Sequence, residues 1–340
     1  MAMGMMRHFR AGGAAAALAL ALAGCGHDHP TAPSVPPPAP EPGRHDLAGV
    51  VFYDEDGDGV LDPEEATRLG GVRVAVDDRR ATTDGAGRFR LDGVRAGSQR
   101  PAIEAASLPP FFDATRLPAV TVPAAPGFEL ALPVTLPIGT NRPHRYLAFG
   151  DSITSGDGSR GGRGYRAELA AQLRDLWGQA DMVNDGEGAG RSDRGADRLP
   201  DSLAQARPAY VLILYGTNDW NRFECHYVPG CFAVPNLRRM VRTARAANTV
   251  PVVATLPPVN PDYTDRLAAE RNSWVIGIND GIRNMVREEG AILADVHAAF
   301  PPEEAALPPL FADHVHPNDA GYARMAEAFF RAITGPRSLP

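Results

Sequence analysis

The sequence has few cysteines and no excess of positive charge. Only 3 of its 340 residues are cysteine, and 41 Asp and Glu residues outnumber 34 Lys and Arg residues, for a formal net charge of -7. Proteins that bind nucleic acid or anionic membranes through surface charge are usually basic, so this balance argues against both partners. With 44% hydrophobic residues the chain can still build cores, and its length suits two domains with flanking segments.

The sequence also begins without an apolar run long enough for a stable membrane-spanning helix. Arg7 and Arg10 precede an Ala- and Leu-rich stretch, 11–23, which is shorter than the roughly 20 residues of a spanning helix. With its closing Leu-Ala-Gly-Cys, the segment resembles a bacterial lipoprotein signal peptide. That resemblance implies removal of residues 1–24 and a lipid anchor on Cys25. A plain secretory signal is the alternative. Either signal exports the protein, and we expect a secreted lipoprotein at the periplasmic face or the cell surface.

The other two cysteines, Cys225 and Cys231, lie close together in the sequence. In an oxidising compartment such a pair favours a local disulfide, and two free thiols are the alternative. A zinc site is not expected here, because the neighbouring His226 alone does not complete a tetrahedral set of ligands.

Composition divides the rest of the chain into three segments. Residues 25–46 are rich in proline and predict an extended linker. Residues 47–138 contain short apolar runs, LAGVVFY, VRVAV and RFRL, broken by Gly, Asp and Pro. TTDGAG between two of the runs is typical of a hairpin turn, so this segment predicts a small all-β sandwich.

From 143 to 335 strand-like runs alternate with amphipathic helices. The apolar runs are 146–150, 182–184, 210–216, 250–256 and 291–296. The predicted helices are Tyr165–Trp177, Pro200–Ala206, Asn236–Ala247, Asp265–Glu288 and Asn318–Ile333. The fourth helix is expected to bury one face, made of Leu267, Trp274, Ile278, Ile282 and Met285. This alternation predicts a three-layer α/β/α domain with a parallel sheet, whose ligand site lies at the carboxyl ends of the strands.

Polar blocks stand where that edge is expected. FGDSIT (149–154) follows the first strand, NDGEGAGRS (184–192) the second and GTND (216–219) the third, and DHVHPN (313–318) opens the last helix. A serine in a tight turn can be a nucleophile, an Asn amide can stabilise an oxyanion, and a carboxylate near a His can orient the imidazole. Each block alone also has a structural explanation as a turn or a helix start.

Together, the blocks FGDSIT, GTND and DHVHP resemble the GDSL/SGNH hydrolase family from about Arg145 to Ile333. The resemblance implies that Ser152 is the nucleophile, His316 the base and Asp313 its orienting partner, with His314 outside the triad.

The resemblance also implies an oxyanion hole. Its donors would be the Ser152 N–H, the Asn218 side chain and the N–H of one glycine. The segment NDGEGAG is one residue longer than the family pattern, which leaves two candidates. Gly190 fits the spacing better, and Gly188 is the alternative.

A second constellation lies at 54–65, where DEDGDGVLDPEE fits a calcium-loop template. Gly59 would supply the sharp turn. The predicted ligands are the carboxylates of Asp54, Asp56, Asp58, Asp62 and Glu65 and the carbonyl of Val60. A solvated acidic turn is the alternative. The region from Leu47 to about Gly97 resembles calcium-binding B-type repeats of bacterial surface adhesins, a transthyretin-like sandwich, which implies a structural Ca²⁺.

These observations predict an exported carboxylic ester hydrolase of the serine type, without a cofactor for catalysis. Short-acyl esters, such as O-acetylated carbohydrate, are the expected substrates, and an insertion at 220–235 is expected to shape the pocket. The alternatives are a lipase- or thioesterase-type activity on lipid esters and a non-enzymatic surface-binding lipoprotein. A metal-dependent hydrolase is not expected, because 143–335 lacks a His/carboxylate cluster with ligand spacing.

Overall fold

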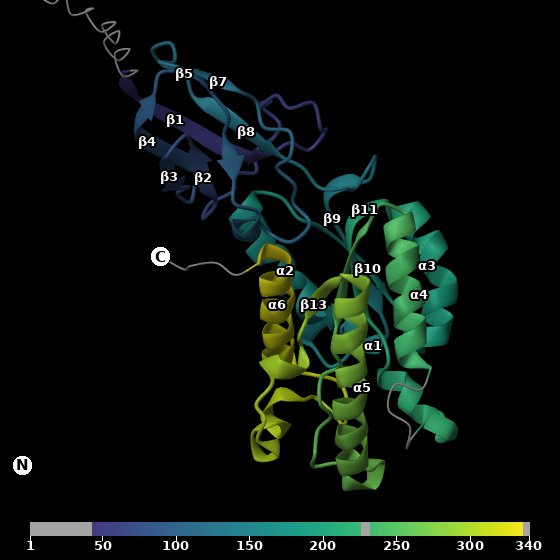
Figure 1. Ribbon diagram of the computed structural model, residues 1–340. Coiled ribbons are helices and arrows are strands. Elements are labelled where there is room, and N and C mark those ends of the chain that lie inside the picture. Colours follow the sequence, from purple (N-terminus) through teal and green to yellow (C-terminus); the bar gives the residue numbers. More distant parts are fainter. Residues whose placement is uncertain (1–42, 226–231, 336–340) are drawn as a thin grey trace, which may run out of the picture. The chain divides into compact units, whose positions relative to one another are not determined.

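The computed structural model describes residues 43–225 and 232–335 (Figure 1). The predicted lipidation site Cys25 and the predicted disulfide partner Cys231 lie outside these residues, as does the signal segment 1–24. Among the helices described, none is both long and apolar enough to cross a membrane.

The chain forms a β-rich N-terminal region and an α/β C-terminal region. The N-terminal strands are β1 (Arg44–Tyr53), β2 (Arg73–Val76), β3 (Arg79–Thr82), β4 (Arg88–Arg95), β5 (Gly97–Gln99), β6 (Ala102–Ile103), β7 (Val120–Val122) and β8 (Leu130–Val134). The C-terminal strands are β9 (Arg142–Gly150), β10 (Asp181–Gly186), β11 (Pro208–Leu214), β12 (Val250–Ala254) and β13 (Ile292–Ala294). The α-helices are α1 (Ser152–Ser155), α2 (Gly164–Trp177), α3 (Ser192–Ala206), α4 (Ala233–Ala246), α5 (Ala268–Glu289) and α6 (Asp319–Thr334). Short 3-10 helices are η1 (Ala105–Ser107), η2 (Arg160–Gly162), η3 (Thr217–Asn221), η4 (Phe223–Cys225), η5 (Thr264–Arg266), η6 (His297–Ala299), η7 (Glu304–Ala306) and η8 (Pro308–Leu310).

Small, mainly antiparallel sheets form the N-terminal region. β1 lies between β4 (antiparallel) and β8 (parallel), β2 lies between β3 and β6, and β5 pairs with β7. Their inward side chains, among them Leu47, Val51, Leu91 and Leu132, form a core of their own. β1 already begins at Arg44, within the predicted linker, because Arg44 and His45 pair with Arg95 and Val94 of β4.

The hairpin predicted at TTDGAG is not formed. The turn connects β3 to β4, and these strands belong to different sheets. Gly87 explains the difference, since its carbonyl accepts the Val51 N–H at 2.8 Å and the turn therefore packs on β1. A Cβ at Gly87 would lie 2.7 Å from the Val51 carbonyl oxygen, so the close approach requires glycine.

The C-terminal region confirms the predicted α/β fold. Its parallel sheet has the strand order β10-β9-β11-β12-β13. The second strand in sequence therefore lies on one side of β9 and the later strands on the other. Such a reversal is a topological switch point, and ligands of open α/β sheets bind outside the carboxyl ends of the strands there. The residues that follow β9 and β11 stand at this point.

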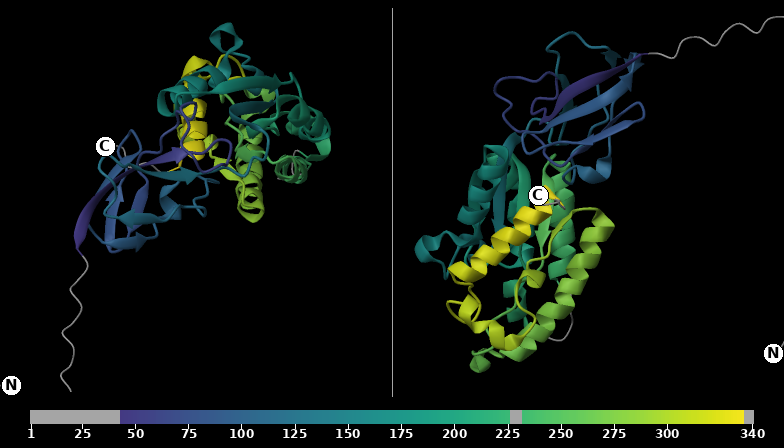
Figure 2. Two further views of the ribbon diagram at one scale, coloured as in Figure 1. Left: turned by 90° about the horizontal axis from the view of Figure 1, so that it is seen from above. Right: turned by 90° about the vertical axis from the view of Figure 1, so that its left-hand side faces the viewer.

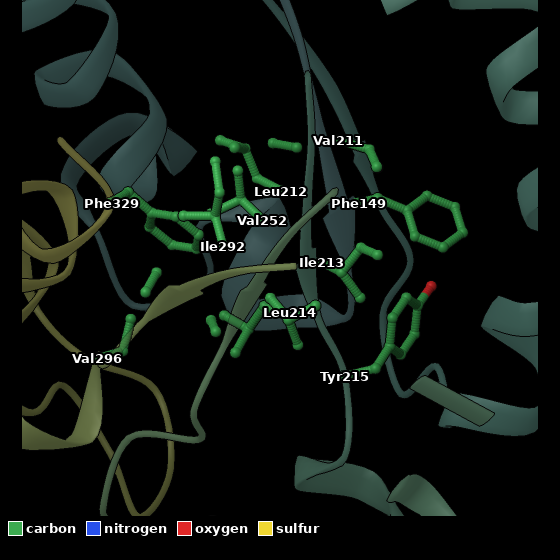
Figure 3. Close-up of a cluster of buried hydrophobic side chains, with 14 of the residues drawn as sticks. Phe149, Val211, Leu212, Ile213, Leu214, Tyr215, Val252, Ile292, Val296 and Phe329 are labelled. Atoms are coloured by element: carbon green, nitrogen blue, oxygen red, sulfur yellow. The ribbon is translucent and has the colours of Figure 1, made fainter. Parts of the chain in front are cut away.

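Helices cover both faces of the sheet. α2 packs against α6, whereas α3, α4 and α5 pack in succession. Figure 2 shows α6 (yellow) beside α2 (teal). Figure 3 shows Ile213 and Tyr215 on one side of β11 and Leu212 on the other, toward Phe329 of α6. Because β11, β12 and the last five residues of β9 are buried on both faces, they are continuous apolar runs rather than alternating ones.

Two helix predictions need correction. α3 starts at Ser192 and contains Pro200, whereas the sequence suggested a start at the proline. Its N-terminus is fixed from outside, because the Asp219 carboxylate accepts the Ser192 N–H at 3.0 Å. In α5, Trp274, Ile278, Ile282 and Met285 are buried as predicted. Leu267 is not on that face, since it precedes the helix with a left-handed φ of 53° and is 50% exposed.

Candidate active site

Ser152 occupies a sharp turn between β9 and α1. The chain can turn here because Gly150 lacks a side chain: a Cβ would lie 2.1 Å from Thr154 Oγ1 and 2.5 Å from the Leu214 carbonyl oxygen. Asp151 is the N-cap of α1, and its Oδ1 accepts the Ile153 N–H at 2.9 Å. This geometry presents Ser152 at the carboxyl edge of the sheet.

The structure brings His316 and Asp313 to Ser152 from a loop more than 160 residues further along the chain. His316 Nε2 lies 2.9 Å from Ser152 Oγ, and His316 Nδ1 lies 2.7 Å from Asp313 Oδ2. An ionised carboxylate only accepts hydrogen bonds, so the ring proton belongs on Nδ1. Nε2 is then free to accept the proton of the Ser152 hydroxyl.

Asp313 is held as a carboxylate by its own loop. Its Oδ1 accepts the backbone N–H groups of Val315 at 2.8 Å and His316 at 2.7 Å. Partial burial raises the pKa of Asp313, but these bonds and the contact with the His316 ring outweigh burial and lower it overall. The group that orients His316 therefore remains charged at neutral pH.

His314 has a different environment. Its Nδ1 lies 3.8 Å from Asp313 Oδ1, too far for a hydrogen bond. Its ring is tilted against Tyr263 with 6.1 Å between centroids, and its carbonyl accepts the Asn260 N–H. Partial burial lowers the pKa of His314, so the neutral ring is favoured.

Asn218 lies on η3, shortly after β11, and contacts the residue that precedes Ser152. Its Nδ2 donates to Asp151 Oδ2 at 3.3 Å and to the Gly190 carbonyl at 3.1 Å. The blocks that follow β9, β10 and β11 therefore meet at this amide, at the switch point of the sheet.

The turn after β10 contains both candidate glycines of the oxyanion hole. The Gly190 N–H donates to the Glu187 carbonyl at 3.0 Å, and Gly190 is buried. That N–H is therefore engaged in this conformation, and the choice between the two glycines stays a prediction. Gly188, the alternative, is exposed. Ala189 between them has a left-handed φ of 57°, which costs a non-glycine residue free energy and is common at functional sites.

Two supporting groups were missed by sequence reasoning. Arg198 Nη2 donates to Tyr215 Oη at 2.8 Å, and its guanidinium lies 4.2 Å from the centroid of the Phe149 ring, so it connects the ends of β9 and β11. Asp219 accepts the Ser192 hydroxyl as well as its N–H and thereby joins the third block to the second. Their partners lie 17 or more residues away. No local spacing indicates such pairs.

In the N-terminal region the acidic loop, 54–65, is folded as a tight turn. Ligand oxygens of Asp54, Asp56 and Asp58 lie within 4.8 Å of one another. Gly59 has a φ of 79°, and its N–H donates to Asp54 Oδ2 at 3.0 Å. The turn expected at Gly59 is thus present.

The remaining predicted ligands close the loop. Glu65 is 5% exposed, and its two oxygens accept the backbone N–H groups of Glu55 at 2.7 Å and Asp62 at 3.3 Å. Desolvation and the carboxylates of Asp58 and Asp56 raise the pKa of Asp62. Such an all-oxygen, negatively charged donor set has the chemistry that Ca²⁺ prefers.

The first part of the 220–235 insertion packs on α5. Cys225 is disulfide-bonded, and its carbonyl accepts the Trp274 Nε1–H at 2.8 Å. Trp220 also packs edge-on against Trp274, with 5.7 Å between centroids. The predicted partner Cys231 is outside the described residues.

Comparison with known proteins places the C-terminal region in a family. Residues 148–324, just over half of the chain, match the model of the GDSL-like lipase/acylhydrolase family. An acetylxylan esterase from Geobacillus stearothermophilus is 27% identical over 205 residues, which cover 56% of this chain and 93% of that protein.

Two solved structures also align with the C-terminal region. A catalytic mutant of the Geobacillus stearothermophilus acetylxylan esterase is 21% identical with a TM-score of 0.45, covering 58% of this chain and 97% of that chain. A GDSL-like lipase from Bacteroides thetaiotaomicron is 19% identical with a TM-score of 0.46, covering 56% and 87%. The family match supports a hydrolase over the non-enzymatic alternative. The chain therefore belongs to the GDSL-like lipase/acylhydrolase family and is a carboxylic ester hydrolase.

Proposed function

We propose that Ser152, His316 and Asp313 hydrolyse esters through an acyl-enzyme. Ser152 Oγ attacks the ester carbonyl carbon while its proton passes to His316 Nε2. The tetrahedral intermediate collapses, the C–O bond to the alcohol breaks, and His316 returns the proton to the leaving alcohol. A water molecule then attacks the acyl-serine by the same route and releases the acid.

The oxyanion is stabilised by the Ser152 N–H, by the Asn218 amide and by one further N–H from the turn at 188–190. Donors that are already oriented toward the developing charge are effective because they need no reorganisation during the reaction. Asp313 keeps the imidazole in the required tautomer. The observation that carries this proposal is the continuous chain of contacts from Asp313 Oδ2 to His316 (2.7 Å) and from His316 to Ser152 Oγ (2.9 Å).

For the substrate we propose short-acyl esters of carbohydrate. The supporting observation is the relative named acetylxylan esterase, which aligns over 93% of its own length. Lipid esters are the alternative. Purified protein should be assayed on 4-nitrophenyl esters from acetate to decanoate and on acetylated xylan, with deacetylated xylan as the control. Release of acetate from xylan and a rate that falls with acyl length support the proposal; a preference for decanoate would contradict it.

We also propose that the protein is exported and anchored through Cys25. The support is the sequence alone: two arginines, an apolar stretch and Leu-Ala-Gly-Cys at 22–25. In an expressing bacterium, labelled palmitate should enter the native protein but not the Cys25→Ser variant, and only the native protein should sediment with membranes. Label in the variant, or native protein in the soluble fraction, would contradict the anchor.

The acidic loop is proposed to hold a structural Ca²⁺. Asp54, Asp56, Asp58, Asp62, Glu65 and the Val60 carbonyl would provide oxygen ligands, and the ion would neutralise the clustered carboxylates. Isothermal titration of the chelator-treated protein with CaCl₂ should give one site, and Asp58→Asn should weaken it. Absence of heat in the native protein would refute the site.

Cys231 is proposed as the disulfide partner of Cys225, closing a small loop that contributes about 2 kcal/mol to stability. Peptide mapping without reductant should recover the two cysteines in one cross-linked peptide. Alkylation of Cys231 under those conditions would contradict the pairing.

A further inference from the structure

The orientation of the Asn218 amide is fixed by its neighbours. A side-chain amide nitrogen has two hydrogens, and Asn218 Nδ2 has two acceptors, Asp151 Oδ2 at 3.3 Å and the Gly190 carbonyl at 3.1 Å. The amide oxygen would be repelled by either acceptor. The neighbours therefore dictate that nitrogen, and not oxygen, faces the nucleophile's side of the turn.

Asp151 connects this amide to the nucleophile. Its side chain is 0% exposed and lies between Gly150 and Ser152 in sequence. One oxygen accepts the Ile153 N–H and caps the helix that begins with Ser152, and the other accepts the Asn218 amide. A single carboxylate thus sets the position of the serine backbone and of the amide. Burying a carboxylate is unfavourable, as the rise of its pKa to about 7 through burial indicates.

Arg271 holds the backbone of the same turn from α5. It is 7% exposed, and its Nη2 donates at 2.8 Å to the carbonyl of Thr217, the peptide that leads into Asn218. Its buried Nε has no hydrogen-bond partner among the described residues. Burial lowers the pKa of Arg271 to about 10, so the guanidinium is still charged at neutral pH, and Asp151 attracts it.

We propose that Asp151 and Arg271 are positioning residues for Asn218: Asp151 orients its amide, and Arg271 fixes the peptide that carries it. The inference rests on the proposed role of Asn218 as an oxyanion donor. One amide hydrogen stays on Asp151 throughout the reaction. The other leaves the Gly190 carbonyl and turns to the oxyanion as it forms. Neither positioning residue touches the substrate, so both act on the transition state through Asn218.

A double-mutant cycle of Asp151→Asn and Asn218→Ala tests the first half. In Asp151→Asn the side-chain oxygen stays on the Ile153 N–H, so an NH₂ group faces the Asn218 NH₂ and turns that amide over. We expect kcat to fall about 100-fold with KM within about twofold, as for loss of one oxyanion donor. The double variant should be no slower than Asn218→Ala alone, because the two residues act as one unit. Effects that multiply, or an unchanged kcat in Asp151→Asn, would overturn the inference.

Arg271 is tested by two substitutions on α5. Arg271→Gln should lower kcat about tenfold at constant KM, and Arg271→Lys, which keeps a charged donor for the Thr217 carbonyl, should recover part of the loss. Arg287→Gln is the matched control, since Arg287 is an exposed residue of the same helix. Circular dichroism and melting curves verify folding, and Arg271→Lys is decisive if the Gln variant unfolds. If both variants fold, wild-type kcat in both would overturn the role of Arg271. If the Gln variant does not fold, wild-type kcat in Arg271→Lys would overturn it, because a partial loss is expected there.

The same measurements separate this inference from the proposed function. Full activity in Ser152→Ala refutes the mechanism itself, and full activity in Asn218→Ala refutes the oxyanion assignment. An impaired Asn218→Ala beside a fully active, folded Asp151→Asn refutes only the positioning role.

Discussion

The loop at 313–318, called the catalytic loop after its proposed role, and the acidic loop at 54–65 both place carboxylates in tight turns. They differ in how the negative charge of the carboxylates is compensated. In the catalytic loop the single carboxylate of Asp313 receives two backbone N–H groups and the ring of His316. In the acidic loop three carboxylates, of Asp54, Asp56 and Asp58, lie within 4.8 Å of one another. The first loop therefore contains hydrogen-bond donors for its one carboxylate, whereas the second places several negative charges close together.

The difference shows in the direction of the pKa shifts. Hydrogen bonds outweigh burial and lower the pKa of Asp313, whereas desolvation and neighbouring carboxylates raise that of Asp62. A carboxylate with internal partners is ready for chemistry in the folded chain. The carboxylates of Asp54, Asp56 and Asp58 also accept backbone N–H groups, but they concentrate negative charge that a cation from solution would neutralise. The predictions below test this distinction.

The largest effect is expected when either side chain of the Ser152–His316 contact is removed. Ser152→Ala and His316→Ala should each reduce turnover about 10⁴- to 10⁶-fold, and the double variant should be no worse, because the pair acts as a unit. Steady-state hydrolysis of 4-nitrophenyl acetate measures this. Asp313→Asn should fold and lose less than Ser152→Ala, since the imidazole is then misoriented but present.

His314→Ala is the control for the same loop. His314 Nδ1 lies 3.8 Å from Asp313 Oδ1, whereas His316 Nδ1 lies 2.7 Å from Asp313 Oδ2. Replacement of His314 should therefore change turnover less than about threefold. If His314→Ala abolished hydrolysis while His316→Ala spared it, the base would be misassigned.

The second prediction concerns Asp151, a carboxylate with hydrogen bonds but no ion pair among the described residues. Burial raises its pKa to about 7 against the opposing influence of His316 and Arg271, with Asp219 adding to the rise. Because the pKa is higher in the folded state, the stabilisation from protonated Asp151 is complete below its unfolded value near pH 4. It is lost as pH rises through 7.

Asp151→Asn has no such titration. The free energy of unfolding of this variant relative to wild type should therefore improve between pH 4 and pH 8, by up to about 4 kcal/mol. Urea unfolding at both pH values measures the change. Asp201→Asn, an exposed site on α3, should show none. A relative stability of Asp151→Asn that does not change with pH would mean that Asp151 is ionised throughout.

These predictions rely on features that differ in how well the sequence reveals them. The parallel sheet was predictable because strands buried on both faces are continuous apolar runs with helices between them. The residues of the proposed triad could be selected from the sequence because each stands in a recognisable block after a strand or before a helix. The N-terminal turn at 82–87 was not, because the choice between a hairpin and a connection between sheets depends on its packing on Val51.

The supporting residues of the site were also beyond local sequence patterns. Arg271 lies 54 positions from the Thr217 carbonyl that it contacts, and Asp151 lies 67 positions from Asn218. The sequence also does not decide between Gly190 and Gly188, for a related reason. Spacing selects a glycine but says nothing about which N–H is already bonded, and the Gly190 N–H is bonded to Glu187.

The third prediction addresses the acidic loop directly. Removing calcium with a chelator should lower the melting temperature by several degrees, since a ligand at 100 times its Kd stabilises the folded state by about 2.7 kcal/mol. Ester hydrolysis below the transition should hardly change. In Asp58→Asn the response to chelator should shrink, and in Asp92→Asn, an exposed carboxylate of β4 with 76% side-chain exposure, it should persist. A chelator-insensitive melting curve would remove the cation from the loop; a large loss of hydrolysis would mean that its role is catalytic.

The smallest effect is expected at Glu55, a residue of the acidic loop whose carboxylate, like that of Asp313, contacts a histidine ring. Both regions belong to one compact unit, and Glu55 Oε1 lies 2.8 Å from Nε2 of His144, a buried residue of β9. Thr67 Oγ1 lies 3.2 Å from the same nitrogen and donates to the Trp177 carbonyl. Because this carboxylate has a partner within the chain, it should contribute to stability without any cation. Glu55→Gln keeps the shape of the side chain and weakens one half-buried contact, so it should lower the free energy of unfolding by about 1 kcal/mol.

This loss of stability in Glu55→Gln should be the same with calcium and with chelator, in contrast to Asp58→Asn, whose effect should appear only with calcium. Glu64, an exposed residue of the same loop, provides the control: Glu64→Gln should leave the free energy of unfolding unchanged in both conditions. A Glu55→Gln effect that vanished in chelator would mean that Glu55 acts through the cation, and the distinction between the two kinds of carboxylate would not hold within this loop.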